Sequence, residues 1–216
     1  MHSNLPPNPF SGLLNRLVDL LVIITGWWLV ALSILTCVEM VGRKLFSFSF
    51  QGIDEVGGYT LAITAAIGFS YTLITRGHTR IDFLVGKLPE KARSAINVLA
   101  MLTLAGMAVF AIWRAWVVLS ESIEFQSHST TPLQTPMWIP QSLWFMGWAL
   151  FTLVCVYLAG HALVLWLRGD HAAVNKAYGP QTLEEEIESE AGEVLEQVKM
   201  EQRLAQQRQQ AKEGAA

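Results

Sequence analysis

The chain has 216 residues, of which 52% are hydrophobic and only 15% are charged, whereas a typical soluble domain has about 25% charged residues. Residues 1–170 carry 10 basic against 9 acidic side chains and residues 171–216 carry 5 against 9, so an acidic segment follows a nearly neutral apolar body. This distribution excludes an ordinary soluble enzyme and, because no basic face exists, a nucleic-acid-binding protein. The two cysteines, Cys37 and Cys155, lack CxxC spacing, which excludes a disulfide scaffold and a four-cysteine zinc site.

Four segments are long and apolar enough to cross a bilayer, which takes about 20 residues for roughly 30 Å of hydrocarbon. Three contain runs without any charged residue, and the fourth contains only His161 as an ionisable group. The sequence therefore predicts an all-α integral membrane protein with four transmembrane helices, at about residues 17–41, 56–75, 94–116 and 141–167. The first apolar run is longer than a signal-peptide core and no A-x-A-like site follows it, so we expect a membrane anchor.

The positive charges of the flanking segments predict the orientation, because cytoplasmic loops carry an excess of Lys and Arg. Three basic residues lie on one side, and seven lie on the side of both termini: Arg16, Arg76, Arg80, Lys87, Lys91, Arg93 and Arg168. We therefore expect both termini in the cytoplasm. Residues 1–16 then form a cytoplasmic N-terminal segment, residues 17–170 the four-helix membrane domain, and residues 171–216 an acidic cytoplasmic tail.

The connections differ in character. The apolar residues that follow Arg114 predict that the third helix continues to about Glu124, so that a helix over 94–124 is about 46 Å long. Residues 43–55 carry Phe46, Phe48 and Phe50 at a spacing of two and are interpreted as a short interfacial segment. From Thr182 onward the tail shows a capping-box pattern and a thin apolar stripe, which leaves two alternatives, a marginal helix and a solvated disordered segment.

Ionisable side chains lie at the ends of the spans and not deep inside them, unlike those of ion pumps and proton-driven carriers. Asp19 and Glu39 are spaced for local ion pairs with Arg16 and Arg43 or for snorkelling, and the alternative is a partner on another subunit. His161 is interpreted as a hydrogen-bonded packing residue, because a haem-binding bundle needs paired axial ligands. We expect no catalytic residue, no metal or cofactor and no substrate ligand in this chain.

Two sequence patterns stand out, one within the second span and one directly after it. Small residues recur every four positions at Gly58, Ala62, Ala66 and Ser70, which favours the close approach of another helix. The segment 76–82, RGHTRID, follows directly. The positive-inside rule explains the arginines of this segment but not its compact order of polar residues around one glycine. These residues are Arg76, Gly77, His78, Arg80 and Asp82.

With these residues the chain resembles the small membrane subunit, of the DctQ type, of tripartite ATP-independent periplasmic (TRAP) transporters. The resemblance covers about residues 15–167, and the RGHTRID segment is its most specific part. The remaining features follow in chain order: Glu39 with Gly42 and Arg43, Asp54 and Glu55 with Gly57 and Gly58, Gly68, Leu88 and Pro89, and Pro132, Pro136 and Pro140.

The resemblance implies a scaffold role. In such transporters a periplasmic substrate-binding protein (DctP type) delivers an organic acid to a large membrane subunit (DctM type), which carries the substrate and sodium sites. The small subunit braces the stationary part of the large one in the bacterial inner membrane. The resemblance thus implies these two protein partners and membrane lipid, no nucleic acid, and no cofactor of its own. Interface candidates are Glu39, Arg43, Asp54, Glu55, Gly58, Ala62, Ala66 and the five residues of the RGHTRID segment named above.

Two other classes of function stay open at this stage. One is a haem- or quinone-binding subunit of a membrane oxidoreductase, against which the missing ligand pairs argue. The other is a stand-alone homo-oligomeric channel or carrier, which the absence of a polar path through the spans disfavours.

Overall fold

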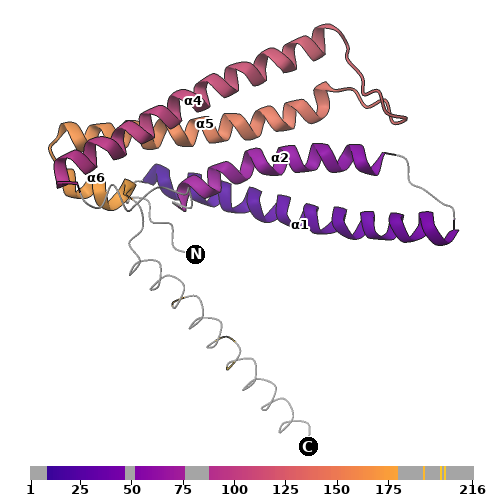
Figure 1. The fold of residues 1–216 in the computed structure, drawn as a ribbon, viewed down its shortest axis with the longest axis horizontal. Coiled ribbons are helices and arrows are strands. Elements are labelled where there is room, and N and C mark those ends of the chain that lie inside the picture. Colours follow the sequence, from indigo (N-terminus) through magenta and orange to yellow (C-terminus); the bar gives the residue numbers. More distant parts are fainter. Residues whose placement is uncertain are drawn as a thin grey trace, which may run out of the picture. The chain divides into compact units, whose positions relative to one another are not determined.

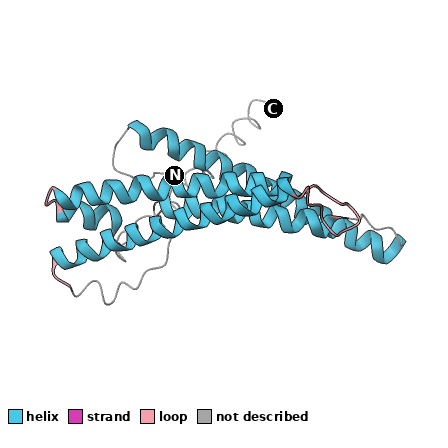
Figure 2. Cartoon of the chain, turned by 90° about the horizontal axis from the view of Figure 1, so that it is seen from above, coloured by secondary structure: helices cyan, strands magenta, loops and turns pink. Residues whose placement is uncertain are grey.

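The structure is a computed structural model that describes residues 9–46, 52–75 and 88–179, together with residues 192, 200 and 202. The chain divides into two compact units, Met1–Gly179 and Pro180–Ala216. Regular structure in the described residues is helical (Figure 2), and the only β feature among them is an isolated bridge between His128 and Pro136.

The first unit contains five described helices: α1 (Pro9–Phe46), α2 (Ile53–Ile74), α4 (Glu90–Glu124), α5 (Trp138–Leu167) and α6 (His171–Tyr178). The first four are long and apolar enough to cross a membrane. The prediction of an all-α protein with four transmembrane helices is therefore confirmed, and α4 ends at Glu124 as expected. Residues 43–46, which we interpreted as part of an interfacial segment, instead continue α1, and residues 47–51 lie outside the described part of the chain.

The long helices lie side by side in the order α1, α2, α5, α4 (Figure 1). Substantial contacts join α1 to α2, α2 to α5, and α5 to α4, whereas α1 makes no substantial contact with α4 in the described residues. A closed four-helix bundle surrounds a central core with all four helices. Among the described residues these helices instead form an open layer, in which α1 joins the common core only near its start, through Leu14 and Val18.

A glycine turn separates α5 from α6. Gly169 adopts a φ of 79°, and its N–H donates to the carbonyl of Trp166 while the N–H of Asp170 donates to the carbonyl of Leu165. This pattern is a Schellman motif, which a residue with positive φ completes. The Asp170 side chain then accepts a hydrogen bond from the N–H of Ala173 and caps α6. The chain consequently turns back at once, and α6 packs against α4 and α5.

Packing within the chain leaves most of the membrane-type surface exposed. None of the most apolar 18-residue window of α1 is buried, and only 28–33% of the windows of α2, α4 and α5 is buried. The main core cluster extends to the end of the layer that holds α6, where Val174 and Tyr178 join residues of α1, α2, α4 and α5. In a bilayer such exposed apolar faces are covered by lipid or by other membrane helices.

Candidate functional site

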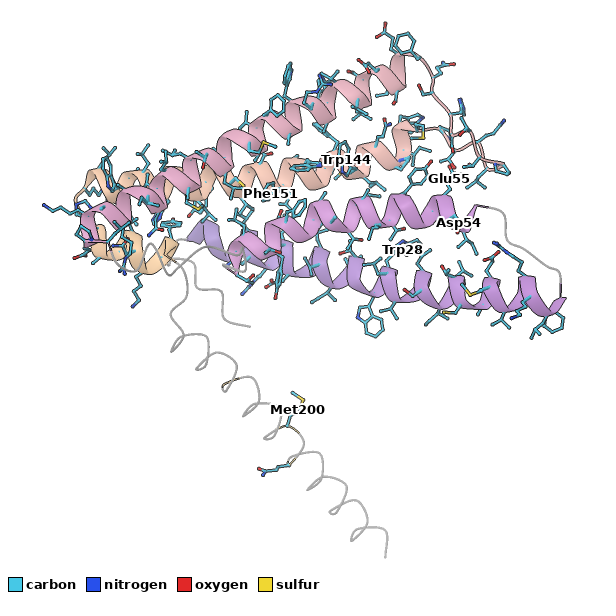
Figure 3. All side chains as sticks on the ribbon, in the orientation of Figure 1. Trp28, Asp54, Glu55, Trp144, Phe151 and Met200 are labelled. Atoms are coloured by element: carbon cyan, nitrogen blue, oxygen red, sulfur yellow. The ribbon has the colours of Figure 1, made fainter. Side chains whose placement is uncertain are left out.

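The charged side chains of the described residues lie toward the two ends of the layer. The loop end comprises the end of α1, the start of α2 and the connection 125–137, and the α6 end comprises the start of α4 and α6. The loop end includes the predicted residues Glu39, Arg43, Asp54 and Glu55 (Figure 3 labels the last two).

The predicted ion pair of α1 is present. Glu39 Oε1 lies 2.5 Å from Arg43 Nη2 and accepts a second hydrogen bond from Nε at 2.9 Å. Glu39 is buried, at 4% exposure, whereas 59% of the Arg43 side chain is exposed. A buried carboxylate is stabilised when a charged partner satisfies it. No comparable ion pair joins Arg16 to Asp19, both of which are described.

Glu55 ties the connection 125–137 to α2. Its Oε1 accepts a hydrogen bond from the Tyr59 hydroxyl at 2.6 Å, and its Oε2 accepts one from the Thr131 hydroxyl. The Tyr59 hydroxyl also lies 3.4 Å from Met137 Sδ. Glu55 is buried, while its neighbour Asp54 is exposed. Both carboxylates lie in the first turn of α2, where the helix dipole favours negative charge. We name the contact of Glu55 with Tyr59 and Thr131 the Glu55 latch.

Gly52 gives the loop room to close on α2. It has a φ of 96°, and a Cβ built there would lie 3.2 Å from Leu133 Cδ2. Within the loop, the N–H of Ser129 donates to the carbonyl of Thr135 and the N–H of Met137 donates to that of Ser127, both at 2.9 Å. The loop is thus an ordered hairpin-like segment that main-chain hydrogen bonds hold together.

The small-residue stripe of α2 divides between two environments. Ala66 is buried against α5, and a Cβ built at Gly147 of α5 would lie only 2.8 Å from Ala66 Cβ. Ser70 is fully buried. Gly58 and Ala62 are exposed, with open space around Gly58. Ala66 thus lies at a close helix contact, whereas Gly58 and Ala62 make no such contact with another described helix.

A groove opens between α1, α2 and the start of α5. It has a volume of about 310 Å³ and is lined by threonines, Tyr59 and apolar side chains of the three helices, together with Thr135 of the loop. The indole N–H of Trp28 donates to the Thr60 hydroxyl at 3.1 Å, and both residues line the groove. The groove exists because α1 and α5 flank α2 without substantial mutual contact.

Polar side chains fasten α6 at the other end of the layer. Asn97 Nδ2 donates to Asn175 Oδ1 at 3.0 Å, Asn175 Nδ2 donates to the carbonyl of Glu90 at 3.1 Å, and Ser94 Oγ lies 3.0 Å from His171 Nδ1. Sequence reasoning missed these contacts, since isolated Asn and Ser residues carry no periodic signal.

His161 takes part in the same assembly. Its Nδ1 lies 2.6 Å from the Tyr178 hydroxyl, which confirms that His161 is a hydrogen-bonded packing residue. Burial, with a smaller contribution from Tyr157, raises the pKa of Tyr178 above its ordinary value of 10.0, so the hydroxyl stays protonated at neutral pH. In the described part of the chain, no three His, Cys, Asp or Glu side chains cluster as metal ligands.

Five predicted residues lie outside the described part of the chain. They are Arg76, Gly77, His78, Arg80 and Asp82. Their predicted role as interface candidates stays a prediction.

Comparison with known families identifies the membrane domain. The family model described as "Tripartite ATP-independent periplasmic transporters, DctQ component" matches residues 32–164, more than half of the chain. The chain belongs to the DctQ family. None of the curated proteins matches it significantly. The DctQ match begins inside α1 and ends near the end of α5, so it includes the Glu55 latch and the Ala66–Gly147 contact. The chain is therefore a small multi-pass membrane subunit of the TRAP transporter type, from a family that works with other TRAP components.

Proposed function

We propose that this DctQ subunit is a scaffold that braces the large membrane subunit (DctM type) of a sodium-coupled TRAP transporter for organic acid uptake. One observation carries the proposal. This DctQ-family chain forms an open layer, and its own residues bury only a minor part of its membrane helices. A layer whose membrane-type surface is mostly uncovered has the shape of a support against which a larger subunit packs.

The distribution of ionisable groups supports this division of labour. In the described residues, the acidic and basic side chains of α1, α2, α4 and α5 lie toward the helix ends, and the middle of each helix is apolar or weakly polar. Coupling ions and organic acids need charged or strongly polar ligands near the midplane. We infer that the large subunit holds the substrate and the sodium ions, and that this chain binds neither them nor a cofactor.

We infer that the chain lies in the bacterial inner membrane with both termini in the cytoplasm. The helix ends near α6 carry Arg16, Lys91, Arg93 and Arg168, whereas the loop end carries Arg43 and Lys44, with Arg114 ten residues before the end of α4. This excess supports a cytoplasmic α6 end. The loop end then faces the periplasm, where a DctP-type binding protein delivers the substrate.

The deciding experiment is an affinity pull-down of the chain from native membranes in mild detergent, followed by mass spectrometry. We expect a large multi-span membrane subunit at one-to-one stoichiometry. Recovery of the chain alone, together with substrate transport by that chain in liposomes, would instead support a free-standing carrier. A visible haem spectrum in the purified sample would support an oxidoreductase subunit.

A further inference from the structure

We propose that the α6 end of the layer binds an anionic phospholipid, whose phosphate lies among basic side chains of α4, α5 and α6. These side chains are Lys91, Arg93, Arg168 and Lys176, and we name them the α6 basic cluster. The proposal gives this chain a ligand of its own among the lipids of the surrounding membrane. It does not depend on the scaffold role, and only the choice of the cytoplasmic leaflet rests on the orientation inferred above.

Polar contacts hold the ends of the three helices together at this corner of the layer. Ser94 Oγ of α4 lies 3.0 Å from Nδ1 of His171, the first residue of α6. In the next turn of α6, Asn175 Nδ2 donates to the carbonyl of Glu90, the first residue of α4, at 3.1 Å. The fold therefore places the start of α4, the end of α5 and the whole of α6 side by side (Figure 1).

The four basic residues lie next to these contacts. Lys91 and Arg93 belong to the first turn of α4, Arg168 is the C-cap of α5, and Lys176 lies in the last turn of α6. Lys91, Arg168 and Lys176 are exposed, and Arg93 is half-buried. Basic residues from three helices thus form one surface that a ligand outside the chain can reach.

The acidic residues of the same helix ends neutralise only part of this charge. They are Glu90 and Asp170, and neither forms an ion pair with another described residue. Asp170 accepts the N–H of Ala173 as the cap of α6, and Glu90 lies in the first turn of α4, where the helix dipole favours a carboxylate. Four basic residues against two acidic ones leave an excess of positive charge. This excess is complementary to the phosphate of an anionic headgroup, and basic surfaces between membrane helices bind such headgroups.

The level of the cluster in the membrane favours a lipid over a soluble anion. α6 begins four residues after Leu167, where the apolar helix α5 ends. In the last turn of α5, Val164, Trp166 and Leu167 are 44%, 36% and 69% exposed, and a tryptophan is typical of the membrane interface. An amphipathic ligand covers both surfaces, with its phosphate at the basic cluster and its acyl chains on these apolar side chains. A free phosphate ion would leave the apolar side chains uncovered.

Lipid retention by the full chain tests the proposal. The chain is reconstituted in nanodiscs that contain equal amounts of phosphatidylglycerol, which is anionic, and phosphatidylcholine, which has no net charge. It is then extracted in mild detergent, and the lipids that stay bound are quantified by mass spectrometry. We expect phosphatidylglycerol to be enriched at least about fivefold, because each basic residue near an anionic headgroup strengthens binding roughly fivefold. Equal retention of the two lipids would overturn the proposal.

Charge-neutral variants locate the site. Lys91→Gln combined with Arg168→Gln removes two exposed charges of the cluster and should reduce the enrichment at least about fivefold. The matched control, Lys44→Gln combined with Arg114→Gln, removes two exposed charges nearer the loop end and should keep the enrichment. Full enrichment in the cluster variant, or an equal loss in both variants, would overturn the assignment to the α6 end.

The melting temperature in detergent gives a second readout and shows that the variants fold. Added phosphatidylglycerol should raise the melting temperature of the unmodified chain and of the control variant, but not that of the cluster variant. Inorganic phosphate should raise none of them. Stabilisation by inorganic phosphate as large as that by phosphatidylglycerol would mean that the cluster binds a free anion, and it would overturn the assignment to a lipid.

Discussion

Gly147 on α5 lies directly against Ala66 on α2, so closely that a Cβ at position 147 would come within 2.8 Å of Ala66 Cβ and 3.4 Å of backbone atoms of α2. The atoms that such a Cβ would meet belong to a short side chain and to the backbone of α2, so they cannot move aside as the end of a long side chain could. The two helices are thus held at a separation that only glycine allows at this position. The contact joins the two hairpins of the layer, because α2 pairs with α1 and α5 pairs with α4.

The first prediction concerns this contact. Gly147→Ala should destabilise the chain by about 1–3 kcal/mol, the usual cost of overpacking a core, and lower its melting temperature in detergent. Gly160→Ala on the same helix is the control, because nothing lies within 4 Å of a Cβ at that position. That control should be neutral or stabilising by about 0.4–1 kcal/mol. Equal melting temperatures for the two variants would show that the helices separate freely here.

The second prediction concerns the Glu55 latch. Glu55→Ala leaves the hydroxyls of Tyr59 and Thr131 without their acceptor, at a cost of about 1–3 kcal/mol when such groups stay buried. We expect faster cleavage of the loop 125–137 in limited proteolysis as well as a lower melting temperature. Asp54→Ala, one residue away but exposed, should change stability by no more than about 0.5 kcal/mol. Unchanged proteolysis of the Glu55 variant would show that the loop is held by other contacts.

The third prediction concerns the attachment of α6. Asn97→Ala and Asn175→Ala each remove one side of a buried amide pair, and Asn175→Ala also frees the carbonyl of Glu90. The double-mutant cycle should give a coupling energy of about 0.5–3 kcal/mol, as expected for residues in contact. Melting temperatures of the four proteins in one detergent measure it. Strictly additive effects would mean that the two amides do not stabilise each other.

Local sequence patterns were sufficient to predict the helices but not to predict the contacts between the helices. Charge-free runs predicted four spans, and the spacing of Glu39 and Arg43 predicted their ion pair, since both signals are local. The Glu55–Thr131 and Asn97–Asn175 contacts join residues that are 76 and 78 positions apart. No periodicity encodes such pairings, because they depend on which helices become neighbours in the layer.

The small-residue stripe shows the same limit within one helix. Residues four apart on an α-helix with 3.6 residues per turn drift by about 40° at each step. From Gly58 to Ser70 the stripe therefore turns by about 120°, which carries it from an exposed face to the buried contact with α5. Spacing identifies the stripe but does not tell which of its members meets a neighbour in the chain.

The fourth prediction uses this division of the stripe. Ala66→Leu should destabilise the isolated chain by about 1–3 kcal/mol, because Ala66 is packed against α5. Ala62→Leu should leave the melting temperature of the isolated chain unchanged, because Ala62 is exposed, yet reduce the yield of large subunit that co-purifies if a partner helix approaches there. Ala31→Leu, at an exposed alanine of α1, is the control for added bulk. Full recovery of the large subunit with Ala62→Leu would mean that this part of α2 faces lipid.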